Sequence, residues 1–246
     1  MDTVKLSIKS YWNWRSSSFG HDSDKSSEIA DKWESIIREL TSRAPGKRAL
    51  DIGTGTGQLA VYLARSGFDV TGIDLADKMV NTAKKYAANL KLNIDFRTGD
   101  AEELPFEDDS IDVVVSRNLL WTLPNPDRAL REWRRVLKPE GLLIVSDGYW
   151  LNTTWKRFHH LAYKILKNIF KNKSLVSLRF FLSYAGLQNS LPFYEGIKLE
   201  RIRSLLDAAC FRQVQSYNTS CLDFKPYGNI RLDQNEPSFF IAHAKK

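Results

Sequence analysis

The chain has 246 residues, of which 43% are hydrophobic, and a formal net charge of +7, a profile that suits one large domain with a sizeable core and excludes a disordered chain. It contains no run of about 18 apolar residues, which excludes a membrane-spanning helix, and no apolar stretch in its first twenty residues, so we expect a cytoplasmic protein without a signal peptide. Neither the two cysteines nor the four histidines have the spacing of a metal site or a disulfide framework, and we expect no metal.

The predicted elements begin with a helix in the N-terminal region. Apolar residues recur there at helical spacing from Ile29 to Leu40, and Pro45-Gly46 ends the pattern. Apolar runs of strand length then alternate with segments of helical periodicity. These runs are Arg48–Ile52, Asp69–Ile73, Ile94–Arg97, Ile111–Ser116 and Leu142–Ser146. A succession of strand, helix and strand predicts a parallel sheet with helices on its faces.

A well-marked helix precedes the fifth predicted strand. Asn125 suits its N-cap and Pro126 its first position. Leu130, Trp133 and Leu137 recur on one face, and we expect the helix to end at the Pro-Glu-Gly sequence that follows.

The C-terminal region is predicted to complete the same sheet. Helical spacing recurs near Lys198–Ala209, and strand patterns lie near Gln213–Thr219 and Ser238–Ala244.

A glycine-rich sequence, DIGTGTG at residues 51–57, directly follows the first strand and opens a helix. Glycine permits positive φ and close approach of a ligand to the backbone, while a helix start presents unpaired N–H groups. Asp74 ends the second predicted strand, and Asp100 ends the third. Because open α/β sheets bind ligands at the carboxyl ends of their strands, these three features together predict a site for a nucleotide-like ligand.

Residues 47–147 resemble the class I S-adenosylmethionine (SAM)-dependent methyltransferases, in the branch of the ubiquinone, menaquinone and biotin-pathway small-molecule methyltransferases. The resemblance rests on LDIGTGTG, on GID around Asp74, on GDAEELPFEDDSIDVVVS and on ALREWRRVLKPEGLLIVSD. It implies an enzyme that transfers a methyl group from SAM to a small-molecule acceptor. The implied fold is α/β and Rossmann-like, with a doubly wound, mostly parallel seven-stranded sheet, a helical N-terminal lid and a helical insertion after the fifth strand.

The resemblance also implies which residues hold the cofactor. The backbone of the glycine-rich sequence would pass under the methionine part of SAM, Asp74 would bind the ribose, and Asp100 would lie at the adenine. The expected cofactor-binding set is Asp51, Gly53, Thr54, Gly55, Gly57, Asp74, Leu75, Met79, Asp100, Ala101, Glu102, Arg117 and Asn118.

Two other interpretations stay open. A nicotinamide dehydrogenase also has a glycine-rich turn and an acidic residue after the second strand, but its G-x-G-x-x-G fingerprint requires glycine where this chain has Gln58. That interpretation also gives no role to Asp51 or to GDAEELPF. A Rossmann-like domain can instead bind SAM as a sensor or an inactive scaffold, because the loop and the strand-end acids indicate binding rather than turnover.

No dedicated catalytic residue is obligatory for methyl transfer. SAM supplies the activated methyl group, and orientation of the acceptor contributes roughly 7–11 kcal/mol. Some relatives have histidines after the fourth strand, where one can act as a base, whereas this chain has Leu119-Leu120-Trp121. Asp147, at the end of the fifth strand, is a candidate for orienting or deprotonating the acceptor, although a carboxylate there is more often a cap or turn residue.

The N-terminal sequence from Tyr11 to Ser16, YWNWRS, is a second candidate site. It resembles the N-terminal lids of the family, in which an aromatic ring faces the sulfonium and an arginine meets a carboxylate, so Tyr11 and Arg15 are candidate catalytic residues. The alternative is an amphipathic helix whose rings pack on the body of the protein.

The segment from Gly148 to Tyr194 has seven basic residues and no Asp or Glu, and it accounts for the whole positive excess of the chain. Its apolar stripe from Trp155 to Ile169 predicts an amphipathic basic helix. Three interpretations stay open: a lid over an apolar substrate pocket, an interfacial helix that meets anionic lipid through residues 150–185, and, with least support, a nucleic-acid surface. The expected partner is a small-molecule acceptor of acidic, aromatic or lipid-soluble kind, and a lipid-soluble acceptor would place the protein at the membrane periphery.

The resemblance thus divides a single methyltransferase domain, residues 1–246, into four parts. These are an N-terminal helical lid (1–44), a SAM-binding core (45–147), a basic aromatic helical insertion (148–195), and a closing helix with strands (196–246).

Overall fold

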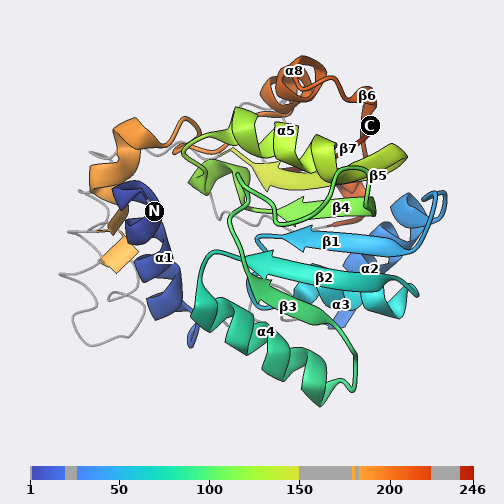
Figure 1. Ribbon diagram of the computed structural model, residues 1–246, viewed down its shortest axis with the longest axis horizontal. Helices are drawn as coiled ribbons and strands as arrows, with labels where there is room; N and C mark the ends of the chain where they lie inside the picture. The colour runs from blue at the N-terminus through green and yellow to red at the C-terminus, as the bar shows by residue number, and fades with distance from the viewer. Residues whose placement is uncertain (1, 20–26, 150–178, 181–182, 223–238) are drawn as a thin grey trace.

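The computed structural model describes residues 2–19, 27–149, 179–180, 183–222 and 239–246. Its centre is a seven-stranded sheet with the order β3-β2-β1-β4-β5-β7-β6 (Figure 1). The first five of these strands pair in parallel, and β7 runs antiparallel to both of its neighbours. The strands are β1 (Arg48–Ile52), β2 (Asp69–Asp74), β3 (Asp95–Thr98), β4 (Ile111–Arg117), β5 (Leu137–Gly148), β6 (Arg212–Ser216) and β7 (Phe239–Lys245). The predicted α/β, mostly parallel, seven-stranded sheet is confirmed.

Helices cover both faces of the sheet. Side chains of α2, α3 and α4 belong to one buried core, and those of α5 and α8 belong to the other. Figure 1 shows α5 in front of the sheet and α2 and α3 behind it. The described helices are α1 (Thr3–Arg15), α2 (Ser27–Thr41), α3 (Gln58–Arg65), α4 (Asp77–Asn89), α5 (Pro126–Val136) and α8 (Leu199–Ala208), with the short 3₁₀-helices η2 (Leu120–Thr122), η3 (Ala185–Ser190) and η4 (Thr219–Cys221).

The central strands carry apolar side chains on both faces because helices cover both sides of the sheet. Successive side chains of a strand point to opposite faces, so Val113 and Val115 of β4 enter the core with α2 and α3, whereas Val114 enters the core with α5. The continuous apolar runs of the sequence therefore mark buried parallel strands.

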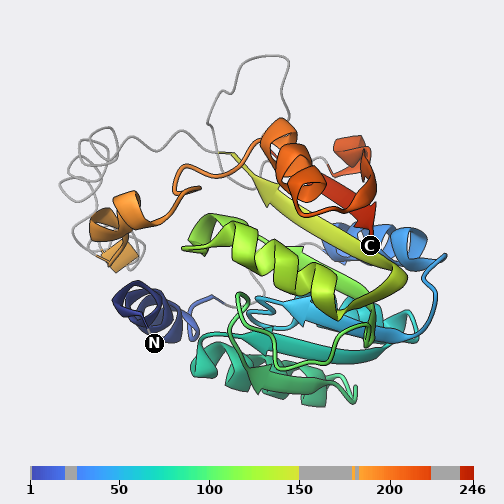
Figure 2. The ribbon, with the colours of Figure 1, turned by 45° about the horizontal axis from the view of Figure 1, so that its top comes forward.

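The helix α1 lies beyond the end of the sheet, although its Ile8 and Tyr11 belong to the core that contains α5 and α8. Figures 1 and 2 show it beyond the carboxyl ends of the parallel strands, close to the start of α4. This is the edge of the sheet at which the glycine-rich loop and the strand-end acids also lie.

The expected end of α5 is corrected by the structure. The helix ends at Val136, and Leu137 already belongs to β5, where it pairs with Ile111 of β4. The Pro-Glu-Gly sequence instead interrupts the register of β5, with Glu140 at a φ of +61°. The apolar spacing did not reveal the change, because the Leu137 side chain stays buried in the same core as the apolar face of α5.

Two of the predicted segments lie wholly or partly outside the described residues. The amphipathic helix predicted between Trp155 and Ile169 lies outside the described residues, as does Ser238 at the start of the last predicted strand. Among the helices that the structure describes, none is long and apolar enough to cross a bilayer.

The core makes a direct stability prediction at Leu130. Its side chain in α5 is fully buried, whereas Leu6 in α1 is 49% exposed. We expect Leu130→Ala to lower the free energy of unfolding by about 2–5 kcal/mol, because it removes buried methyl groups and leaves a cavity. The matched change Leu6→Ala should stay within about 0.5 kcal/mol of the parent. Urea denaturation followed by circular dichroism measures both, and equal losses would contradict the assigned core.

Candidate functional site

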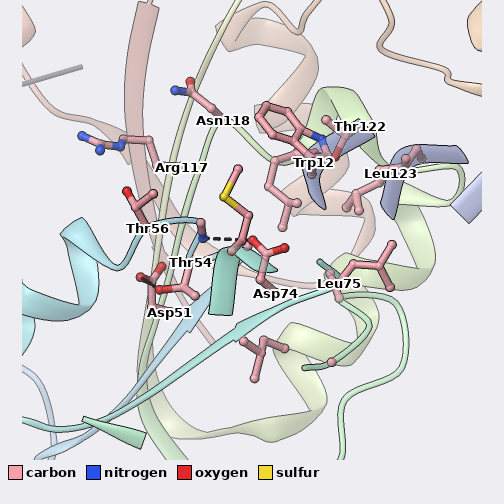
Figure 3. Close-up of a pocket in the computed structure, with 18 of the residues that line it drawn as sticks. Trp12, Asp51, Thr54, Thr56, Asp74, Leu75, Arg117, Asn118, Thr122 and Leu123 are labelled. Atoms are coloured by element: carbon pink, nitrogen blue, oxygen red, sulfur yellow. Dashed lines mark hydrogen bonds between the residues drawn. The ribbon is translucent and has the colours of Figure 1, made fainter. Parts of the chain in front are cut away.

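A cavity of about 390 Å³ opens at the carboxyl ends of β1, β2, β3 and β4. Its walls come from the glycine-rich loop, from the residues after these strands, and from α1 and η2. In Figure 3, Asp51 and Thr54 lie on one side of Asp74, and Trp12 and Leu123 lie on the other. The cavity therefore has a polar half beside the glycine-rich loop and an apolar half beneath α1.

The glycine-rich loop presents open backbone to the cavity at Gly55. This residue has a φ of +55°, which other residues rarely adopt, and a Cβ built on it would find no atom nearer than the Gly53 carbonyl oxygen at 4.0 Å. At Gly53, by contrast, a Cβ would lie 2.8 Å from a methyl of Leu119. The space above Gly55 is thus a cradle that a side chain would fill and that a ligand can occupy.

Asp51 fastens this loop from within β1. Its Oδ2 accepts hydrogen bonds from the Thr54 hydroxyl at 2.6 Å and from the backbone N–H of Ala60, in α3, at 3.0 Å. Burial raises the pKa of Asp51 to about 6, although these hydrogen bonds oppose the rise. The Asp51 side chain borders the cavity, and its described hydrogen bonds hold the glycine-rich loop in place.

Asp74 joins the end of β2 to the same loop. Its Oδ2 accepts from the backbone N–H of Gly55 at 2.9 Å (Figure 3), and its Oδ1 accepts from that of Ala76 at 2.8 Å. Desolvation raises the pKa of Asp74 to about 6 against the effect of these two donors. Each carboxylate oxygen has a second lone pair for a ligand hydroxyl, and the residue borders the cavity.

A carboxylate pair lies after β3, where Asp100 and Glu102 share one cation. The Lys5 Nζ lies 2.7 Å from Asp100 Oδ2 and 2.6 Å from Glu102 Oε2. Glu102 is fully buried and also accepts from the backbone N–H of Asn125 at 2.7 Å. Asn125 occupies the predicted N-cap of α5, yet its side chain donates to Glu102 instead of capping the helix. Asp100 faces the cavity, and Glu102 supports the wall behind it.

Arg117 and Asn118, at the end of β4, border the polar half of the cavity. The Arg117 guanidinium donates to Gln58 Oε1 and lies 4.8 Å from the centre of the Trp33 ring of α2. Asn118 adopts a φ of +56°, and its backbone N–H donates to the Ser146 carbonyl at 2.8 Å. Both residues are therefore fixed by packing and hydrogen bonds before any ligand enters.

The expected cofactor set is largely brought together by the structure. Gly57 and Glu102 do not border the cavity. Gly57 is the N-cap of α3, and Glu102 is the buried partner of Lys5. The members that border the cavity are Asp51, Gly53, Thr54, Gly55, Asp74, Leu75, Met79, Asp100, Ala101, Arg117 and Asn118.

The apolar half of the cavity is walled by aromatic rings. Trp12 of α1, Trp121 of η2 and Phe180 border it, and Phe19 lies at its edge beside Trp12. Behind them the buried Tyr184 ring stacks on Phe180, with the two ring centres 4.8 Å apart. Ile8, Leu119 and Leu123 complete an apolar surface.

Tyr11 and Arg15, the candidates from the N-terminal sequence, stand behind this wall. Tyr11 is buried edge-on against the rings of Trp12, Phe180 and Tyr184. Arg15 donates to the Ser18 hydroxyl at 2.6 Å and lies 5.4 Å from the Phe19 ring centre. Neither is among the described residues that border the cavity. Their contacts are those of a helix that packs on the rest of the protein.

The α1 residues that do border the cavity are Lys5, Ile8 and Trp12. Sequence reasoning missed Lys5 and Ile8 and placed Trp12 only within a motif. Their spacing of three and four residues, which puts them on one helix face, was the available signal.

Asp147 lies behind the cavity wall and is fully buried. Its Oδ2 accepts from the Leu120 N–H at 3.1 Å, and its Oδ1 accepts from the Gly148 N–H at 2.8 Å. Burial raises the pKa of Asp147 to about 7. This carboxyl anchors the η2 turn that carries Trp121. Such a contact fits the cap or turn role, which the sequence left open as the alternative to a catalytic one.

The raised pKa of Asp147 predicts how stability depends on pH. Between the ordinary value of 3.8 and about 7, the folded state keeps a proton that the unfolded state loses, so stability falls as pH rises through this range. We expect Asp147→Asn to make this fall shallower in urea titrations at pH 4 to 7, because the amide does not ionise. Asp127→Asn, at an exposed position of α5, is the control. A slope that Asp147→Asn leaves unchanged would contradict the assignment.

Comparison with known proteins places this geometry in a family. A family model described as "Methyltransferase domain" matches residues 50–145. The demethylmenaquinone methyltransferase of Renibacterium salmoninarum is 35% identical over 116 residues, which are 47% of each chain, so the match spans about half the length of that relative. The demethylmenaquinone methyltransferase of Staphylococcus aureus (strain MRSA252) is 30% identical over 187 residues, 74% of this chain and 75% of the relative.

A solved structure shows the same fold. The [4+2]-cyclase SpnF is 22% identical, has a TM-score of 0.60, and is matched over 88% of this chain and 80% of its own. Because a cyclase shares the architecture, the fold by itself does not specify methyl transfer. Family membership comes from the sequence match to the staphylococcal relative and from the matched methyltransferase domain. The chain belongs to the class I SAM-dependent methyltransferases.

Proposed function

We propose that the protein transfers the methyl group of SAM to a small, largely apolar acceptor. The observation that carries the proposal is the single cavity that joins an open glycine backbone and a strand-end carboxylate to an aromatic wall. The relatives named as demethylmenaquinone methyltransferases support a small-molecule acceptor.

The polar half of the cavity fits the cofactor. The cradle at Gly55 leaves room for the methionine part beside the backbone, Asp74 has lone pairs for the ribose hydroxyls, and Asp100 lies where the adenine would end. Arg117 and Asn118 lie beside the methionine end. When bound, SAM supplies a methyl group that its sulfonium has already activated.

The apolar half fits the acceptor. A flat apolar molecule can lie against Trp12, Trp121 and Phe180 and is held there mainly by burial of its surface. Aromatic faces also attract a nearby cation, which favours placing the sulfonium at the junction of the two halves. An acceptor of aromatic or lipid-soluble kind therefore suits the cavity better than a strongly charged one.

The protein's own contribution is positioning rather than acid–base chemistry. The acids among the described lining residues are Asp51, Asp74 and Asp100, and each already accepts a hydrogen bond from the protein. Packed aromatic side chains exclude water and limit the orientations of the acceptor, an effect worth roughly 7–11 kcal/mol when the geometry is favourable. Tyr11, Arg15 and Asp147 would then act through the walls that they support.

Contact with the membrane periphery stays a prediction. Most of the basic segment that motivated it, residues 150–178, lies outside the described residues. A lipid-soluble acceptor would be consistent with such contact.

The cofactor assignment predicts the effects of two substitutions on binding of S-adenosylhomocysteine, the demethylated cofactor. Gly55→Val should weaken binding at least about tenfold, because the new side chain occupies the cradle, and Asp74→Asn should weaken it by losing charged acceptors. Gly186→Val is the matched control, since a Cβ there meets no neighbouring atom. Isothermal titration calorimetry measures all three, and parent-like affinity in both site variants would overturn the assignment.

Binding should also depend on pH through Asp74. The ionised carboxylate accepts hydrogen bonds from hydroxyl groups better than the protonated acid does, and burial raises the pKa of Asp74 to about 6. Affinity for S-adenosylhomocysteine should therefore fall as pH is lowered from about 7.5 to 5, whereas Asp74→Asn should show a flatter profile. An identical pH profile in the two proteins would remove Asp74 from the ribose site.

Turnover separates an enzyme from a sensor. We expect the protein with methyl-labelled SAM to label a component of the organic-solvent fraction of a cell extract and to release S-adenosylhomocysteine. The aqueous fraction of the same extract is the comparison. Labelling confined to the aqueous fraction would contradict an apolar acceptor, and binding of SAM without label transfer to either fraction would favour the sensor.

A further inference from the structure

Lys5 links α1 to the wall of the cofactor half. Its ammonium lies 2.7 Å from Asp100 and 2.6 Å from Glu102, and its side chain is only 12% exposed. Burial alone would lower the pKa of Lys5, but the hydrogen bonds and charges of the two acids raise it overall, so the ammonium stays charged. A mostly buried cation between two carboxylates is costly to unpair, because Glu102 is fully buried and would lose its partner away from water.

The polar contacts at the other end of α1 are weaker. Lys9 lies 3.1 Å from Asp77, and the Asn13 side chain donates to Asp77 at 3.0 Å and accepts from the Lys78 backbone N–H at 2.9 Å. The Asp77 side chain is half exposed, and ion pairs in such positions contribute little. The Lys5 cluster is therefore the dominant polar tie between α1 and the site.

The same helix face contributes to both halves of the cavity. Lys5 reaches the acid that faces the adenine end, Ile8 lies one turn farther along, and Trp12 forms part of the aromatic wall. Because a helix moves as a rigid unit over two turns, any change in the docking of Lys5 also displaces Trp12. In Figures 1 and 2, α1 lies beyond the strand ends, and its Ile8 and Tyr11 pack in the core that holds α5 and α8, so Lys5 adds a polar tie to apolar docking.

We propose that Lys5 is a positioning residue that couples the cofactor half of the cavity to the acceptor half. A ligand in the cofactor half contacts the docked face of α1 and so stabilises docking, and docking in turn places Trp12 against the acceptor and slows release of the cofactor. Linkage makes the two effects reciprocal. The inference rests on the proposed function, because it takes the adenine end of SAM to lie at Asp100.

Hydrogen–deuterium exchange of the α1 amides tests this coupling without an acceptor. In the parent protein, saturating S-adenosylhomocysteine should slow exchange in residues 3–15 by about tenfold. Lys5→Met keeps a long side chain but removes the charge, and it should leave α1 exchanging fast with or without ligand. The ligand should also dissociate about tenfold faster from this variant, as measured by stopped flow. Lys5→Arg should restore most of both effects.

Lys32→Met, which removes an exposed ion pair with Glu28 in α2, is the matched control and should behave like the parent. If the parent binds the ligand but α1 exchange does not change, the coupling is overturned, whether or not Lys5→Met folds. Parent-like exchange and release in a folded Lys5→Met variant would also overturn it. Absence of any ligand binding by the parent would instead contradict the proposed function, so the two failures are distinguishable.

Discussion

The hydrogen bond from the Gly55 N–H to the Asp74 carboxylate ties together the two strand ends on which the site is built. It joins the loop after β1 to the last residue of β2, and the adjacent Thr54 N–H donates to the Ile73 carbonyl at 2.9 Å. A loop held this closely keeps the backbone open at Gly55 and fixes the carboxylate beside it. The ribose and methionine contacts proposed for the polar half depend on this junction, because it sets where these two parts of the ligand can lie relative to each other.

Buried carboxylates elsewhere act as scaffolding around this junction. Asp51 holds the loop, Glu102 holds the start of α5 and the Lys5 ammonium, and Asp147 holds the turn that carries Trp121. Each of these acids accepts hydrogen bonds from protein donors, so they rigidify the walls instead of meeting the acceptor. The shape of the acceptor half, with its aromatic rings already packed, then suits catalysis by orientation and exclusion of water.

The sequence predicted much of this because parallel strands, glycine-rich loops and strand-end acids are local patterns. The succession of strands along the chain and the cavity position of Gly55, Asp74 and Asp100 follow from such patterns and from family resemblance. Lys5 was missed because its partners, Asp100 and Glu102, are 95 and 97 residues away in the sequence. The spacing of residues within α1 cannot predict an ion pair with such distant carboxylates. The end of α5 was misplaced because Leu137 is equally buried as the last turn of a helix or the first residue of a strand.

A crystal structure of the protein with S-adenosylhomocysteine tests the central claim most directly. We expect ligand density along residues 53–56, with the ribose hydroxyls within hydrogen-bond distance of Asp74, the adenine beside Ala101, and the sulfur facing the aromatic wall at Trp12 and Trp121. Lys5 should still bridge Asp100 and Glu102. Density for the ligand in any other place, or a ribose that makes no contact with Asp74, would contradict the account.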